Sequence, residues 1–139
     1  MTKTPRRQAR EAALQALYFW EVGRTAPDDA LDGVFAEHLP DATDAVRAFA
    51  ETLVRGAVAE HQETDGLIEK QSSHWRLDRL AVIDKSILRL AVWELRHQPE
   101  TPPAVIVNEA LELARTFSGE ESVKFVNGVL DGIRKALNP

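Results

Sequence analysis

Four basic residues lie within the first ten positions, where there is no acidic residue. They are Lys3, Arg6, Arg7 and Arg10. On a helix Arg6 and Arg10 lie one turn apart, and Arg7 and Arg10 are neighbours at a spacing of three. Guanidinium groups are planar, permanently charged and rich in donors, so they suit phosphate. Because the helix dipole disfavours cations at a helix start, the run either binds an external anion or is a solvated helix start.

A second candidate binding segment is Val-Lys-Phe-Val-Asn-Gly at residues 123–128. Its two valines belong to an apolar stripe, whereas Lys124 and Asn127 lie three residues apart on an adjoining face. The Phe125 ring could stack on an unpaired base while Lys124 takes a phosphate. It could equally pack on a second neighbouring helix, and the spacing alone leaves both interpretations open.

The sequence shows no pattern that indicates catalysis. It contains no cysteine, no glycine-rich phosphate loop and no His-Glu-x-x-His pattern. Glu94 and His97 have the Glu-x-x-His spacing of di-iron bundle proteins, but those sites need a second such pair, which is lacking. We therefore expect His97 in the last turn of a helix, where a cation suits the dipole. We expect no enzyme activity, no catalytic residue, no metal and no cofactor.

The charge of the chain excludes a generally basic nucleic-acid binder. The 139 residues are 44% hydrophobic and 28% charged, which is typical of a globular domain, and we expect one domain over 1–139. The net charge is −5, and it is −9 once the first ten residues are set aside. Any contact with nucleic acid must therefore use a local patch. The longest stretch without a charged residue is nine residues, so we expect a soluble, cytoplasmic protein and no membrane partner.

Helical spacing recurs along the chain, and no strand-type alternation occurs. The pattern predicts an all-α fold of about seven helices, the first with Thr4 as cap, Pro5 as first residue and Gly23 at its end. The second runs from about Pro27 to His38. The later starts are expected after Asp41, after a break near Thr64 and Gly66, after Asp78, after Thr101, and at a capping box from Ser118 to Glu121. The sixth helix has the widest apolar face and should be central.

Several segments together resemble the NusB family of bacterial transcription antitermination factors. They are Arg-Arg-Gln-Ala-Arg-Glu at 6–11 leading into 15–18, Val-Ile-Asp-Lys-Ser-Ile-Leu-Arg at 82–89, Asn-Glu-Ala-Leu-Glu-Leu-Ala at 108–114, and Lys-Phe-Val-Asn-Gly-Val-Leu at 124–130. They occur in the family's order, and the likeness covers essentially the whole chain. The last motif is the most specific of them.

The resemblance implies a fold of two packed small helical bundles without catalysis. It implies binding of single-stranded boxA RNA in ribosomal RNA leader transcripts, as a heterodimer with a small-subunit ribosomal protein, also called NusE. It also implies action with RNA polymerase and other Nus factors. Some relatives form homodimers that cover the RNA face, and the sequence does not indicate which state it prefers.

The resemblance also carries over to individual positions. With the two candidate segments above, the RNA-binding set becomes Arg6, Arg7, Arg10, Glu121, Lys124, Phe125 and Asn127. Asp84 matches an acidic position that faces the ribosomal protein, and Tyr18 is a second candidate there. Gln8 stands where some relatives have a third consecutive arginine, which lowers the expected number of phosphate contacts.

The sequence leaves other functions open. One is a helical adaptor that binds only proteins. Another is a bundle enzyme whose site has no recognisable motif. A NusB-like domain also precedes the catalytic domain of certain ribosomal RNA cytosine methyltransferases. Because nothing follows Pro139 here, we do not expect a methyltransferase.

Overall fold

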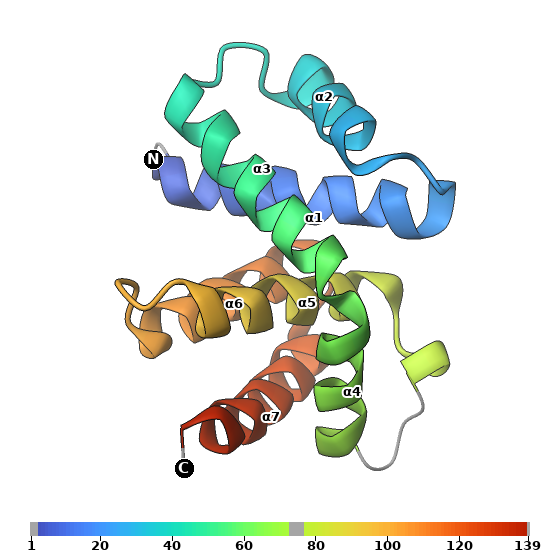
Figure 1. Ribbon diagram of the computed structural model, residues 1–139, viewed down its shortest axis with the longest axis vertical. Coiled ribbons are helices and arrows are strands. Elements are labelled where there is room, and N and C mark those ends of the chain that lie inside the picture. Colours follow the sequence, from blue (N-terminus) through green and yellow to red (C-terminus); the bar gives the residue numbers. More distant parts are fainter. Residues whose placement is uncertain (1–2, 73–76, 139) are drawn as a thin grey trace. The chain divides into compact units, whose positions relative to one another are not determined.

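The computed structural model describes residues 3–72 and 77–138, which form helices and no strand (Figure 1). The elements are α1 (Pro5–Gly23), α2 (Pro27–His38), α3 (Asp44–Ala59), α4 (His61–Gln71), the short 3-10 helix η1 (Leu77–Arg79), α5 (Val82–His97), α6 (Pro103–Phe117) and α7 (Glu120–Leu137). The predicted all-α class is confirmed. No helix in this part of the chain combines the length and the apolar character that a bilayer span requires.

The chain divides into two compact units, Met1–Ala59 and Glu60–Pro139. In the first unit α1 contacts α2 and α3, and these two contact each other. In the second unit α5 contacts α4, α6 and α7, and α7 also contacts α4 and α6. Each unit is therefore a small helical bundle, as the resemblance implied.

The start of α1 follows the sequence prediction, and this start positions the arginines. The Thr4 hydroxyl accepts a 3.1 Å hydrogen bond from the Arg7 amide, and Pro5 occupies the first helical position. At the other end, Arg24 adopts the left-handed conformation with φ 54°, and its amide donates to the Phe19 carbonyl. The residue that turns the chain after α1 is therefore Arg24, one position beyond Gly23.

The break between α3 and α4 lies at Glu60, so the predicted break near Thr64 is wrong. Gly66 sits inside α4, and a side chain at this position would meet no other atom within 4 Å. A glycine inside a helix costs only about 1 kcal/mol and need not end it. The start of α3 also differs from the prediction, because the Thr43 hydroxyl, not Asp41, accepts the 3.2 Å bond from the Val46 amide.

The central helix of the second unit is α5, not the predicted sixth helix. It begins at Val82, and Asp78 belongs to the separate η1. All eleven residues from Asp84 to Glu94 are buried, whereas the buried residues of α6 are only Ile106, Ala110, Leu113 and Ala114. The apolar pattern underestimated the burial of α5, because five of those eleven residues are polar or charged. One of them is Arg89, whose guanidinium donates two 2.9 Å hydrogen bonds to Asp65.

The apolar stripe of α7 lies in the core as predicted. Its buried members are Val123, Val126, Leu130 and Ile133, joined by Val129. The predicted capping box is wrong, since the cap residue is Gly119 and no side chain caps the helix. The Ser118 hydroxyl is engaged elsewhere, with Asp84 and Ser122. This places three polar groups at the junction of α5 and α7.

Candidate functional site

The N-terminal arginine cluster, Arg6, Arg7 and Arg10, lies in the first two turns of α1. Arg6 is exposed and Arg7 is half-buried, but Arg10 is only 4% exposed. The three arginines were predicted as one basic surface. In the structure they differ in access, so Arg6 is the member best placed to meet a ligand from solvent.

A ring that the sequence did not single out lies beside two of these arginines. The Cζ atom of Arg6 lies over the Phe49 ring, 3.8 Å from its centroid, and the Cζ atom of Arg10 is 5.5 Å from the same centroid. Phe49 is half-buried on α3. Cations are attracted to the face of an aromatic ring, so α3 supplies a support for guanidinium groups of α1.

Two other basic side chains of this unit are engaged within the protein. Lys3 pairs with Glu11 at 2.6 Å, and Arg47 donates to the carbonyls of Pro40 and Ala42. Within residues 3–59, by contrast, Arg6 makes no ion pair with an acidic side chain. Its N–H donors are therefore available to an anion.

Arg55 illustrates the alternative arrangement on the same unit. Its guanidinium donates two 3.2 Å hydrogen bonds to Asp28 and pairs with Glu51 at 2.6 Å. The hydrogen bond and the charge of Asp28, followed by the charge of Glu51, raise the pKa of Arg55. An arginine held in this way has its donors and its charge satisfied within the protein.

The second unit contains a pocket of about 320 Å³ between the start of α5 and the start of α7, which we call the α5–α7 pocket. Its lining residues are Arg79, Leu80, Ala81, Asp84, Glu121, Ser122 and Phe125. Three of them, Asp84, Glu121 and Phe125, were predicted as site residues. Phe125 is half-buried and forms part of the wall of the pocket.

The carboxylate of Asp84 is bound by hydroxyl groups. Ser122 donates a 3.1 Å hydrogen bond to Oδ2, Ser118 donates a 3.3 Å bond to Oδ1, and the two hydroxyls lie 2.6 Å apart. Asp84 is 9% exposed, and no base among the described residues forms an ion pair with it. The carboxyl group is therefore held in place by neutral hydroxyl groups, and Arg79 lines the same pocket.

The remaining predicted residues lie on the surface. On α7, Glu121, Lys124 and Asn127 are exposed. On α1, Tyr18 is 37% exposed and meets Phe19 edge-on, with ring centroids 5.9 Å apart. Phe19 and Val22 are also exposed, so the end of α1 carries a small apolar surface.

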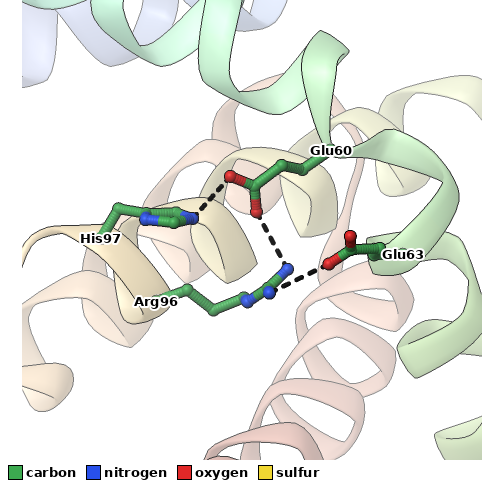
Figure 2. Close-up of polar contacts among 4 residues, drawn as sticks. All are labelled: Glu60, Glu63, Arg96 and His97. Atoms are coloured by element: carbon green, nitrogen blue, oxygen red, sulfur yellow. Dashed lines mark hydrogen bonds and ion pairs between the residues drawn. The ribbon is translucent and has the colours of Figure 1, made fainter.

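His97 lies in the last turn of α5, as predicted, and faces an acidic side chain (Figure 2). Its Nε2 atom is 2.6 Å from Oε2 of Glu60, while Arg96 bridges Glu60 at 2.9 Å and Glu63 at 3.0 Å. Glu94, one turn before His97, is buried. No cluster of three or more metal-ligating side chains occurs among the residues that the structure describes, and His74 lies outside them.

Sequence reasoning missed Phe49, Arg79 and the two serines that hold Asp84. Phe49 belongs to the apolar stripe of α3, and nothing local marks it as a partner of Arg6. Ser118 was given a different role, as a helix cap. The sequence does contain a signal for Ser122. It lies four residues after Ser118, a spacing that lets the two hydroxyl groups meet and bind the same carboxylate.

Comparison with known proteins identifies the family. The model of the NusB family matches residues 7–135. The transcription antitermination protein NusB of Myxococcus xanthus is 45% identical over 136 residues, which cover 96% of this chain and 96% of the relative. NusB of Desulforapulum autotrophicum is 42% identical over 134 residues, covering 96% of this chain and 93% of the relative.

A solved structure gives the same result for the fold. A chain in the crystal structure of antitermination factors NusB and NusE in complex with double-stranded RNA superposes with a TM-score of 0.86. It is 32% identical, and the match covers 95% of this chain and 97% of the other. The chain described here therefore belongs to the NusB family of non-enzymatic transcription antitermination factors.

Proposed function

We propose that this chain binds boxA RNA of ribosomal RNA leader transcripts together with the ribosomal protein NusE, and acts in the cytoplasm with RNA polymerase and other Nus factors. The observation that carries the proposal is the exposed guanidinium of Arg6, which has no acidic partner in residues 3–59 although the chain as a whole is acidic. The likeness to a NusB bound to NusE and RNA supports it.

The proposed division of labour follows the chemistry of the side chains. Arg6, Arg7 and Lys124 take phosphates, which contribute affinity but carry no sequence information. Phe125 stacks on an unpaired base in the α5–α7 pocket, and Glu121 and Asn127 bond to base edges. The match to the family model spans residues 7–135 and so includes both units, which supports one functional domain over 1–139.

NusE is proposed to contact Asp84 and Tyr18. Asp84 offers a fixed carboxylate that forms no ion pair among the described residues, so it suits a lysine or arginine of the partner. Tyr18, with Phe19 and Val22, offers an exposed apolar surface. Aromatic side chains of this kind are enriched at protein interfaces.

The test is RNA binding with and without NusE, measured by fluorescence anisotropy over a series of KCl concentrations. The probes are a labelled single-stranded boxA RNA, a scrambled single strand and an RNA duplex. We expect the boxA strand to bind more tightly than the scrambled strand, and NusE to strengthen binding. Arg6→Gln and Lys124→Gln should each lower the slope of log K against log salt by about 0.7.

The matched control is Arg55→Gln, which removes the same charge from an arginine that acidic side chains already hold. Its salt slope should equal that of the unmodified protein. The proposal fails if Arg6→Gln/Lys124→Gln binds boxA RNA as tightly as the unmodified protein at about 0.1 M salt, where phosphate contacts matter.

A helical adaptor that binds only proteins is the second candidate, and the exposed apolar end of α1 favours it. If the chain were such an adaptor, it would bind NusE but none of the three RNA probes. The same titrations therefore distinguish the two candidates.

A further inference from the structure

We propose that Phe49 is a positioning residue of the RNA site, whose ring holds the Arg6 guanidinium ready for an RNA phosphate. The inference rests on the proposed function and adds to it a residue of α3 that does not itself meet the RNA. Its basis is the 3.8 Å distance between Cζ of Arg6 and the ring centroid of Phe49, which is van der Waals contact.

A ring orients an arginine without using its hydrogen-bond donors. The guanidinium is planar, and its five N–H groups lie in the plane. When one face of the plane contacts an aromatic ring, the donors at the edge remain available for the two oxygens of a phosphate. The contrast with Arg55 is direct, because Asp28 and Glu51 orient that guanidinium and also occupy its donors.

The ring is itself held in place. Phe49 is half-buried on α3, and Arg10, which is 4% exposed, approaches the same ring at 5.5 Å. Arg10 is therefore part of the support, while Arg6 on the exposed side meets solvent. An unsupported arginine on a surface loses many rotamers when it binds a ligand, and one already held on a ring loses fewer.

The central variant is Phe49→Leu, which keeps an apolar side chain and removes the aromatic face. With NusE present, we expect it to bind the labelled boxA RNA about two- to five-fold more weakly, the ratio that corresponds to an exposed cation–π contact. The salt slope should not change, because no charge is lost. Phe49→Tyr keeps the ring and should restore the affinity of the unmodified protein.

A double-mutant cycle shows whether Phe49 acts through Arg6. Phe49→Leu should weaken binding in the unmodified protein but have no further effect in the Arg6→Gln background. An equal effect in both backgrounds would mean that the ring meets the RNA directly or acts on the fold, and would overturn the proposal. Unmodified affinity for Phe49→Leu would overturn it as well.

A second variant covers the outcome that Phe49→Leu does not fold, which thermal unfolding would reveal. Arg6→Lys keeps the charge on the exposed side of α1 but lacks the planar group. It should weaken binding with an unchanged salt slope, and unmodified affinity for it would overturn the proposal. If Arg6→Gln itself leaves RNA binding unchanged, the assignment of RNA phosphate to Arg6 fails, whereas an effect of Arg6→Gln without one of Phe49→Leu removes only Phe49.

Discussion

The hydroxyl of Ser122 donates a 3.1 Å hydrogen bond to Oδ2 of Asp84, which ties the first turn of α7 to the first turn of α5. The Ser118 hydroxyl lies 3.3 Å from Oδ1, so each carboxylate oxygen has a hydroxyl group within hydrogen-bond distance. Hydroxyl donors fix the orientation of a carboxylate while leaving its charge in place. The arrangement is suited to receiving a cation from another molecule.

Asp84→Asn should weaken the heterodimer with NusE without unfolding the protein. The amide has nearly the same size and still accepts from one serine, but it lacks the charge. A hydrogen bond to a charged group contributes about 1.5–3 kcal/mol. We therefore expect Asp84→Asn to lose binding free energy of that order, measured by calorimetric titration with NusE. Equal affinity for Asp84→Asn and the unmodified protein would remove Asp84 from the interface.

Arg10 and Arg6 should respond differently to the same substitution. Arg10→Gln should lower the free energy of unfolding by about 1 kcal/mol or more, because it removes the packing of a long side chain that is only 4% exposed. Arg6→Gln removes only an exposed contact with the Phe49 ring, which contributes about 0.5–1 kcal/mol at most, so it should destabilise the protein less than Arg10→Gln and act mainly on RNA binding. Thermal unfolding of the two variants, followed by circular dichroism, checks this; equal destabilisation by both would contradict the difference in burial.

Leu130→Ala should cost about 2–5 kcal/mol of stability, the usual range for a packed leucine. Leu130 is completely buried in α7 and belongs to the predicted stripe. Val105→Ala is the matched control, since Val105 is 44% exposed on α6, and its loss should stay below about 0.5 kcal/mol. Urea unfolding of both variants tests the assignment, and a loss below about 0.5 kcal/mol for Leu130→Ala would place the stripe outside the core.

Two glycines one turn apart on α7 should differ in the change of stability when each is changed to alanine. At Gly128 a side chain meets no atom within 4 Å, so Gly128→Ala should raise the free energy of unfolding by about 0.5–1 kcal/mol. At Gly132 the new Cβ would lie 2.6 Å from Cδ of Gln71 and closer still to its Oε1, so the Gln71 side chain must move. Gly132→Ala should therefore raise the free energy of unfolding less than Gly128→Ala does, or lower it. When Gly132→Ala is combined with Gln71→Ala, the clash is absent and the increase should match that of Gly128→Ala.

Asp131 should titrate below the ordinary aspartate range. Hydrogen bonds from Lys135 and Arg134, together with the charge of Lys135, lower the pKa of Asp131 from its ordinary value of 3.8. A carboxyl with a lowered folded pKa contributes stability above its unfolded pKa and loses this contribution as pH falls through the folded pKa. Lys135→Gln should move the pKa back toward 3.8 in a carbon NMR titration. Because the pair is at the surface, about 1 M salt should do the same.

The sequence predicted the helices better than the details of their ends. Periodic apolar spacing located the stripe of α7 and the bounds of α2 because it depends on local geometry alone. It failed at Glu60 and at Ser118, where side chains that could act locally bind residues far along the chain instead. Glu60 pairs with Arg96 and His97, and Ser118 bonds to Asp84.

The sequence could predict those candidate residues that lie together on one helix, but not a contact formed between two helices. The arginines of α1 and the motif of α7 are visible as spacing. Phe49 is not, because its meeting with Arg6 depends on how α3 packs on α1. The burial of Arg10 was missed for a similar reason, since a pattern of residue types does not show which basic side chain the fold will cover.

The shared wall of the α5–α7 pocket has a consequence for how two ligands affect each other. Asp84, proposed for NusE, and Phe125, proposed for RNA, line one pocket, and Ser122 bonds the first while lying one turn from the second. Thermodynamic linkage then requires reciprocity: the factor by which RNA tightens NusE equals the factor by which NusE tightens RNA. In this arrangement Ser122 lies between the two proposed ligands, so Ser122→Ala should change their cooperativity as well as the affinity for NusE, because it removes one of the hydroxyls that orient Asp84.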